Sequence, residues 1–130
     1  MKKIFFAVPI ILFALTACEE SGIFKEENPP VITVTQPTEG AIYSVSDTIY
    51  IKGNFSDDTN VQTYTVDVKK VNSNNIMSYT KINELDTTTI PLDTFVIVPT
   101  AMTGNYQLIL YCEDPNDNFT NKVVNFSVIP

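Results

Sequence analysis

The chain contains no histidine and no arginine among its 130 residues, so all 8 basic side chains are lysines. Histidine is the commonest general base, and serine or cysteine nucleophiles usually depend on it for activation. The formal net charge is −7, and an acidic protein without arginine is a poor match for the phosphate backbone of nucleic acids. The composition therefore argues against an enzyme and against a nucleic-acid-binding protein.

Long hydrophobic runs are also scarce, and the one at the start is short. Lys2 and Lys3 precede the apolar run Ile4–Ala14, as in the charged and hydrophobic parts of a secretory signal. A helix that spans a bilayer needs roughly 20 apolar residues, so this run is too short to cross comfortably. A short membrane anchor and a buried helix are the alternatives. We expect residues 1–17 to be an export signal.

The residues at the end of this run are similar to a known processing motif. Leu15-Thr16-Ala17-Cys18 resembles the lipobox of bacterial lipoproteins, which implies diacylglycerol on the Cys18 sulfur, cleavage before Cys18 and acylation of the new amino terminus. Several acyl chains hold a protein stably in a membrane. Glu19 and Glu20 resemble a surface-export signal of Bacteroidetes-type lipoproteins, although they also suit the start of a solvated tether. We expect a protein of the outer membrane, and the sequence leaves open whether it faces the periplasm or the cell surface.

Only one cysteine remains if Cys18 carries lipid. Cys112 then has no disulfide partner, and its alternating apolar surroundings favour a small buried side chain over a nucleophile. The domain must then be held by its hydrophobic core, which is feasible at about 100 residues. Residues 18–30 are acidic and end in two prolines, which indicates a flexible tether before a domain over residues 31–130.

Short β-rich runs separated by proline, glycine, asparagine and aspartate follow the tether. The alternation of apolar and polar residues is clearest in residues 48–55 and 106–113. Pro91 indicates an edge strand or a bulge in its run, whose buried face the pattern leaves unassigned. Seven strands are expected, at Val31–Thr35, Thr48–Phe55, Gln62–Val71, Ile76–Ile82, Thr88–Val98, 106–113 and Lys122–Ile129. They predict an all-β, seven-strand antiparallel immunoglobulin-like sandwich.

Several short motifs carry a second resemblance. Asn-Pro-Pro-Val-Ile-Thr-Val from Asn28, Gly104-Asn105-Tyr106 and the loop Asp114–Asn118 resemble segments of bacterial immunoglobulin-like domains. The chain is most similar to the small immunoglobulin-like lipoproteins of Bacteroidetes typed as DUF4625. The histidines common in that family are absent here, so a ligand role carried by them does not transfer. Asp117 replaces the hairpin glycine, which Asp tolerates in left-handed geometry.

Two acidic loops are the candidate metal site. They supply Asp57 and Asp58 from one loop and Asp114, Asp117 and Asn118 from the other. In an immunoglobulin-like sandwich both loops lie at the same end, and such oxygen ligands suit Ca²⁺. The second loop also resembles a calcium-binding linker of cadherins, where it joins two domains. Ordinary turn chemistry, in which Asp and Asn bond their own backbone, is the alternative.

Exposed tyrosines are the other candidate site. Tyr50, Tyr79 and Tyr111 fall on polar faces or in weak strands, and Tyr43 is expected in a loop. Aromatic rings stack on sugars or anchor protein interfaces, although tyrosines also pack singly on sheet surfaces. We expect a lipid-anchored binding or accessory module that contacts an envelope protein or an extracellular glycan. The alternatives are a structural spacer or assembly subunit without a soluble ligand and, more remotely, a two-carboxylate enzyme with little room for a cleft.

Overall fold

The computed structural model describes residues 28–83, 86–100 and 102–130. The predicted leader, Cys18 and most of the predicted tether lie outside these residues. The described part of the chain includes no helix that is long and apolar enough to cross a membrane.

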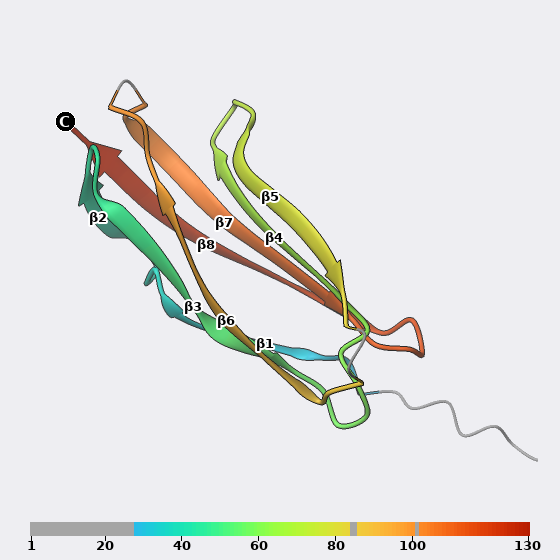
Figure 1. Cartoon of the computed structure of the whole chain (residues 1–130). Helices are drawn as coiled ribbons and strands as arrows, with labels where there is room; N and C mark the ends of the chain where they lie inside the picture. Colours follow the sequence, from blue (N-terminus) through green and yellow to red (C-terminus); the bar gives the residue numbers. More distant parts are fainter. Residues whose placement is uncertain (1–27, 84–85, 101) are drawn as a thin grey trace, which may run out of the picture.

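Eight strands make up the described domain, and they form two sheets that face each other (Figure 1). The three-stranded sheet has the order β1-β3-β6, and the five-stranded sheet has the order β2-β8-β7-β4-β5. The bounds are β1 Val31–Gln36, β2 Ala41–Ser44, β3 Thr48–Ser56, β4 Thr63–Lys70, β5 Asn75–Ile82, β6 Thr89–Ile97, β7 Gly104–Glu113 and β8 Phe119–Ile129. This arrangement confirms the predicted all-β, immunoglobulin-like sandwich, but it has eight strands where seven were expected, and one pair of strands is parallel.

The strand that the sequence pattern missed is β2. It pairs with β8 in parallel, whereas the other pairs of neighbouring strands are antiparallel. The chain therefore leaves the three-stranded sheet after β1 and joins the five-stranded sheet at β2, which closes this side of the sandwich. Tyr43, expected in a loop, lies in β2, where its ring packs edge-on against Phe126 with centroids 5.8 Å apart.

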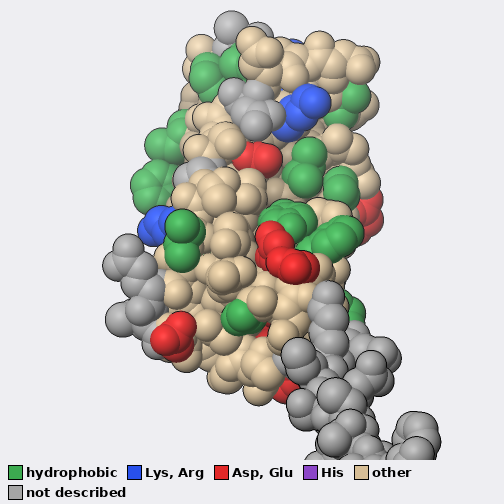
Figure 2. Space-filling view, turned by 90° about the vertical axis from the view of Figure 1, so that its right-hand side faces the viewer, with side chains coloured by type: hydrophobic (Ala, Val, Ile, Leu, Met, Phe, Trp, Pro, Cys, Tyr) green, Lys and Arg blue, Asp and Glu red, His purple; other side chains and the backbone are tan. Residues whose placement is uncertain are grey.

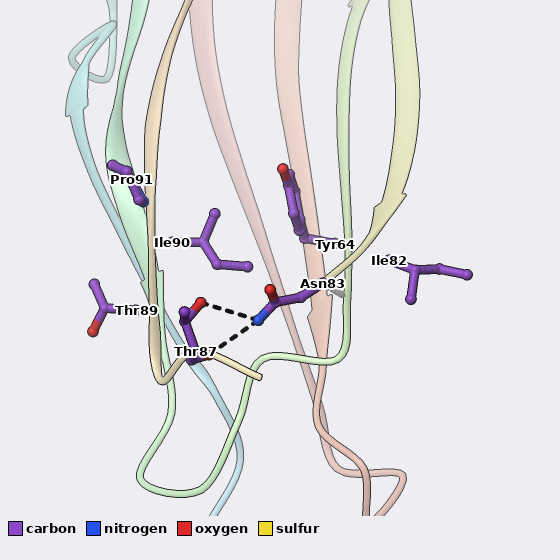
Figure 3. A pocket seen from close by; sticks show the side chains of 7 residues that line it. All are labelled: Tyr64, Ile82, Asn83, Thr87, Thr89, Ile90 and Pro91. Atoms are coloured by element: carbon purple, nitrogen blue, oxygen red, sulfur yellow. Dashed lines mark hydrogen bonds between the residues drawn. The ribbon is translucent and has the colours of Figure 1, made fainter. Parts of the chain in front are cut away.

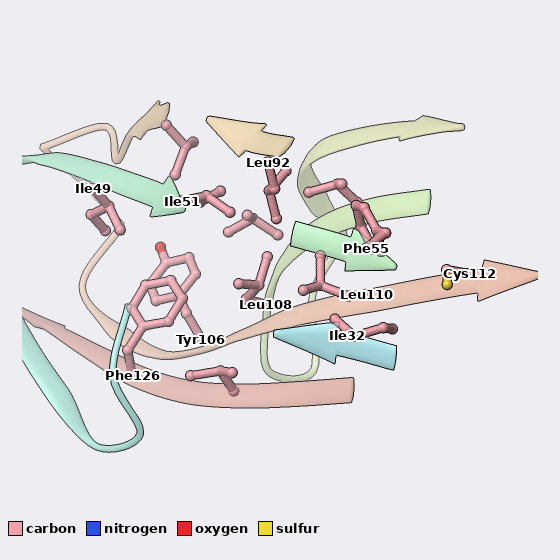
Figure 4. Close-up of a cluster of buried hydrophobic side chains, with 14 of the residues drawn as sticks. Ile32, Ile49, Ile51, Phe55, Leu92, Tyr106, Leu108, Leu110, Cys112 and Phe126 are labelled. Carbon is pink, nitrogen blue, oxygen red and sulfur yellow. The ribbon is translucent and has the colours of Figure 1, made fainter. Parts of the chain in front are cut away.

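The core lies between the two sheets and follows the predicted alternation. Strand β7 buries every second residue from Tyr106 to Cys112, and Val124, Phe126 and Val128 of β8 are buried as expected. Figure 4 shows Tyr106 beside Phe126 in this cluster, and their rings are stacked with centroids 5.5 Å apart. The Tyr106 hydroxyl donates a hydrogen bond to the Met102 carbonyl, so the polar group that this ring carries into the core is satisfied.

Strand β6 is an edge of the three-stranded sheet, as Pro91 predicts. The structure also assigns its buried face, which the sequence left open. Leu92, Val96 and Val98 point inward, while Phe95 and Ile97 are exposed. Because both faces of this run carry apolar residues, its sequence shows no alternation of apolar and polar residues that would identify the buried face.

Candidate functional site

The two acidic loops lie at the same end of the sandwich, at the lower right of Figure 1. One loop joins β3 to β4 and the other joins β7 to β8. Both approach Cys112, near the end of β7. Burial raises the pKa of the Cys112 thiol to about 12, and the negative charges of Asp57 and Asp114 act in the same direction. The fold therefore brings both predicted carboxylates to the same end of the sandwich, close enough to Cys112 for their charges to act on its thiol.

In the first loop, the Asp57 carboxylate accepts hydrogen bonds from residues that follow it in the same loop. Its Oδ1 atom accepts hydrogen bonds from the Thr59 amide at 2.9 Å, the Thr59 hydroxyl at 2.7 Å and the Asn60 amide at 3.0 Å. Its Oδ2 atom is shielded from solvent and has no hydrogen-bond partner. Asp58 is exposed, and its carboxylate accepts a hydrogen bond from the Asn28 side chain at 3.0 Å.

In the second loop, Asp114 is fully buried and organises the hairpin. Its Oδ1 atom accepts hydrogen bonds from the amides of Asn116 at 2.7 Å and Asn118 at 2.8 Å. Its Oδ2 atom accepts one from the Asn118 side chain at 2.7 Å. Asp117 is exposed and has a φ of 64°, the left-handed geometry expected where this residue replaces glycine.

These bonds match the turn-chemistry interpretation of the loops. The carboxylates of Asp57 and Asp114 cap backbone amides of their own loops, as Asp does in Asx turns. Within residues 28–83, 86–100 and 102–130, no group of three or more His, Cys, Asp or Glu side chains is arranged to hold a metal ion. The hydrogen bonds favour turn chemistry, and calcium binding through these loops stays an untested alternative.

A hydrogen-bond network that the sequence did not reveal lies beside the first loop. The Asn83 side chain donates to Asn60 Oδ1, to the Thr87 carbonyl and to the Thr87 hydroxyl, each at 3.1 Å. The Asn60 side chain in turn donates to Asp86 Oδ1 at 3.0 Å. The network joins the β3–β4 loop to the residues between β5 and β6, so it links the two sheets at this end.

A pocket of about 400 Å³ opens above this network (Figure 3). Tyr64 of β4 and Ile90 of β6 contribute apolar walls, and Asn83 and Thr87 contribute polar groups. The pocket lies on the side of the sandwich that the β1–β2 crossing does not close. Sequence reasoning missed it, because its walls come from strands that do not pair with each other.

The outer face of the three-stranded sheet carries three large exposed side chains, which we call the three-strand patch: Tyr50, Phe95 and Ile97. They are 50%, 56% and 54% exposed, and Tyr50 lies directly opposite Phe95 in the register of β3 and β6. Lys52 Nζ lies 5.5 Å from the centroid of the Tyr50 ring and 3.6 Å from the Asp93 carboxylate. A charged pair therefore borders this apolar patch.

The outer face of the five-stranded sheet carries a second group, the five-strand patch: Tyr111, Phe119 and Val123. Apolar side chains gather on this side of the molecule (Figure 2). The rings of Tyr111 and Phe119 stack with centroids 5.9 Å apart. The Tyr111 hydroxyl donates to Glu113 at 2.7 Å, and this hydrogen bond, helped by burial, raises the pKa of Tyr111 to about 12. The Tyr79 side chain lies outside the described parts.

Fold and surface together define a small immunoglobulin-like β-sandwich domain with exposed aromatic side chains on both outer faces. The chain belongs to the DUF4625 family, a domain of unknown function, whose model matches residues 16–129. No curated protein matches the chain. The family match confirms that part of the resemblance drawn from the sequence motifs.

Proposed function

We propose that this protein is a lipid-anchored binding module of a bacterial outer membrane that contacts an envelope protein or an extracellular glycan through the three-strand patch. The observation that carries the proposal is the exposure of Tyr50, Phe95 and Ile97, each at least half accessible on adjacent strands. Contiguous exposed apolar side chains mark interaction sites, and aromatic rings are common anchors there.

The proposed anchor sets the orientation of the domain. The chain enters the domain at Asn28, which bonds Asp58 of the acidic end, whereas the C-terminus lies at the opposite end (Figure 1). Residues 18–27 would reach at most about 35 Å if fully extended. Acylation of Cys18 would therefore place the acidic end toward the membrane and leave both sheet faces open to the side.

The border of the three-strand patch favours a specific contact over indiscriminate adhesion. Lys52 lies over the Tyr50 ring and beside Asp93, so a partner meets an apolar centre with charges at its rim. This is the usual anatomy of a protein interface. Aromatic rings also offer flat surfaces on which sugar rings stack.

A pull-down from envelope extracts and a glycan array test the proposal. The bait is the mature chain from residue 18 carrying Cys18→Ser, which removes the proposed lipid attachment site and changes no residue of the described domain. We expect Tyr50→Ala with Phe95→Ala to lower binding at least about tenfold, the equivalent of 1.4 kcal/mol. The matched control is Phe119→Ala with Val123→Ala, which removes comparable exposed side chains from the five-strand patch and should leave binding unchanged.

Equal loss from both variant pairs would contradict the role of the three-strand patch. Failure of the wild-type bait to retain any protein or glycan, together with self-association in sedimentation, would favour the structural spacer or assembly subunit. Proteolysis of intact cells would show which side of the outer membrane the domain faces.

A further inference from the structure

The two sides of the sandwich differ. On one side the chain crosses from β1 to β2 and so closes the gap between the sheets. On the other side the edge strands β5 and β6 belong to different sheets and do not pair. The pocket of about 400 Å³ lies on this open side, and its size falls within the range of small-molecule sites.

The walls of the pocket are apolar and come from both sheets. Tyr64 and Ile90 stand on opposite sides of the space (Figure 3). The Tyr64 ring also contacts Phe55, with centroids 4.9 Å apart and planes inclined by 34°. Because Phe55 is fully buried, this contact holds the Tyr64 ring in place. An aromatic wall is therefore already formed in the absence of a ligand, which lowers the entropic cost of binding.

The floor of the pocket is polar and rigid. The Asn83 amide is fixed by its hydrogen bonds to Thr87 and Asn60, and Thr87 contributes a hydroxyl group to the lining. Amide and hydroxyl groups donate and accept hydrogen bonds without carrying charge. Among the described residues, no ionised side chain lines the pocket. The lining therefore suits a neutral ligand that has both an apolar face and hydroxyl groups.

We propose that this pocket is a second binding site, distinct from the three-strand patch, and that it takes one ring of a neutral saccharide. A pyranose presents a C–H face that packs on an aromatic ring and hydroxyl groups that bond amides and hydroxyls. The Tyr64 ring supplies the first contact, and Asn83 and Thr87 supply the second. Binding at this site would require neither the lipid anchor nor the three-strand patch, so it can be tested independently of the proposed function.

Titration of the ¹⁵N-labelled Cys18→Ser mature chain, followed by NMR, tests the site. The probes are the neutral disaccharides maltose, cellobiose and diacetylchitobiose, with glucuronic acid as the charged comparison. We expect at least one neutral probe to shift the amide signals of Asn83, Thr87 and Ile90 in a saturable way, and to leave Tyr50 and Phe95 unmoved. Glucuronic acid should bind at least about tenfold more weakly, because none of the described residues that line the pocket is cationic and could offset desolvation of its carboxylate.

Two variants locate the binding. Ile90→Phe fills the pocket from one wall without removing a hydrogen bond of the floor, and it should lower affinity at least about tenfold. Phe119→Ala, on the opposite sheet face, should leave affinity unchanged. Spectra with dispersed signals confirm that each variant is folded.

Shifts confined to the three-strand patch, unchanged affinity in the folded Ile90→Phe variant, or no saturable shift with any neutral disaccharide would each overturn the assignment. Tighter binding of glucuronic acid would overturn the ligand class. None of these results bears on retention of an envelope protein by the three-strand patch, which the pull-down measures.

Discussion

Replacement of Asp114 by alanine should destabilise the domain more than any other change in the acidic loops. The carboxylate is fully buried and accepts three hydrogen bonds, from the two backbone amides of Asn116 and Asn118 and from the Asn118 side chain. A hydrogen bond to a charged group contributes about 1.5–3 kcal/mol. The three bonds act on one hairpin and are not additive, so we expect a loss of about 3 kcal/mol in the free energy of unfolding.

Urea denaturation at pH 7, followed by circular dichroism, measures this loss. A change of about 3 kcal/mol would lower the melting temperature of a domain of this size by about 10–20 °C. Asp58→Ala is the matched control, because Asp58 is exposed and accepts a side-chain hydrogen bond from Asn28. Its cost should stay within about 0.5 kcal/mol. Equal stability of the two variants would refute the view that the Asp114 carboxylate organises the β7–β8 hairpin.

Four further predictions concern other parts of the structure. Millimolar calcium in place of EDTA should leave the melting temperature unchanged, because Asp57 and Asp114 already cap their own loops; a rise would show a bound ion, since a ligand specific to the folded state stabilises it. Cys112 should resist thiol reagents at pH 8 until urea unfolds the domain, because it is fully buried and its pKa is raised to about 12; labelling at the rate of a free thiol would contradict its burial. The pKa of a thiol in an unfolded chain is about 8.5, so Cys112 loses its proton at lower pH in the unfolded state than in the folded state. The free energy of unfolding should therefore fall from about pH 9 as the pH rises toward 12. A flat profile in urea titrations at alkaline pH would contradict the raised pKa. Gly53→Ala should cost about 1–3 kcal/mol, because a Cβ atom there would lie 2.0 Å from the Thr33 carbonyl oxygen; wild-type stability in urea would contradict that close approach.

The fold was predictable wherever one strand face is buried and the other is not. Strand β7 buries Tyr106, Leu108, Leu110 and Cys112, and that alternation is visible in the sequence alone. Strand β2 was missed for a physical reason. It has only four residues, which is too short for a clear alternation of apolar and polar residues. Its partner β8 also lies far away in the sequence, so no local sequence pattern predicts the pairing.

The candidate sites divide in the same way. The carboxylates of the acidic loops stand out in the sequence because Asp and Asn cluster there, and the partners of Asp114 lie within four residues of it. The three-strand patch depends on the register that sets Tyr50 opposite Phe95, which the sequence does not specify. The pocket depends on the packing of one sheet against the other, since Tyr64 and Ile90 belong to different sheets.

Mass spectrometry of the protein purified from its native membrane tests whether Cys18 is lipidated. We expect a mature chain that begins at Cys18 and carries diacylglycerol on the Cys18 sulfur. A native product that retains residues 1–17 and carries no fatty acid would contradict the proposal of a membrane-tethered binding module.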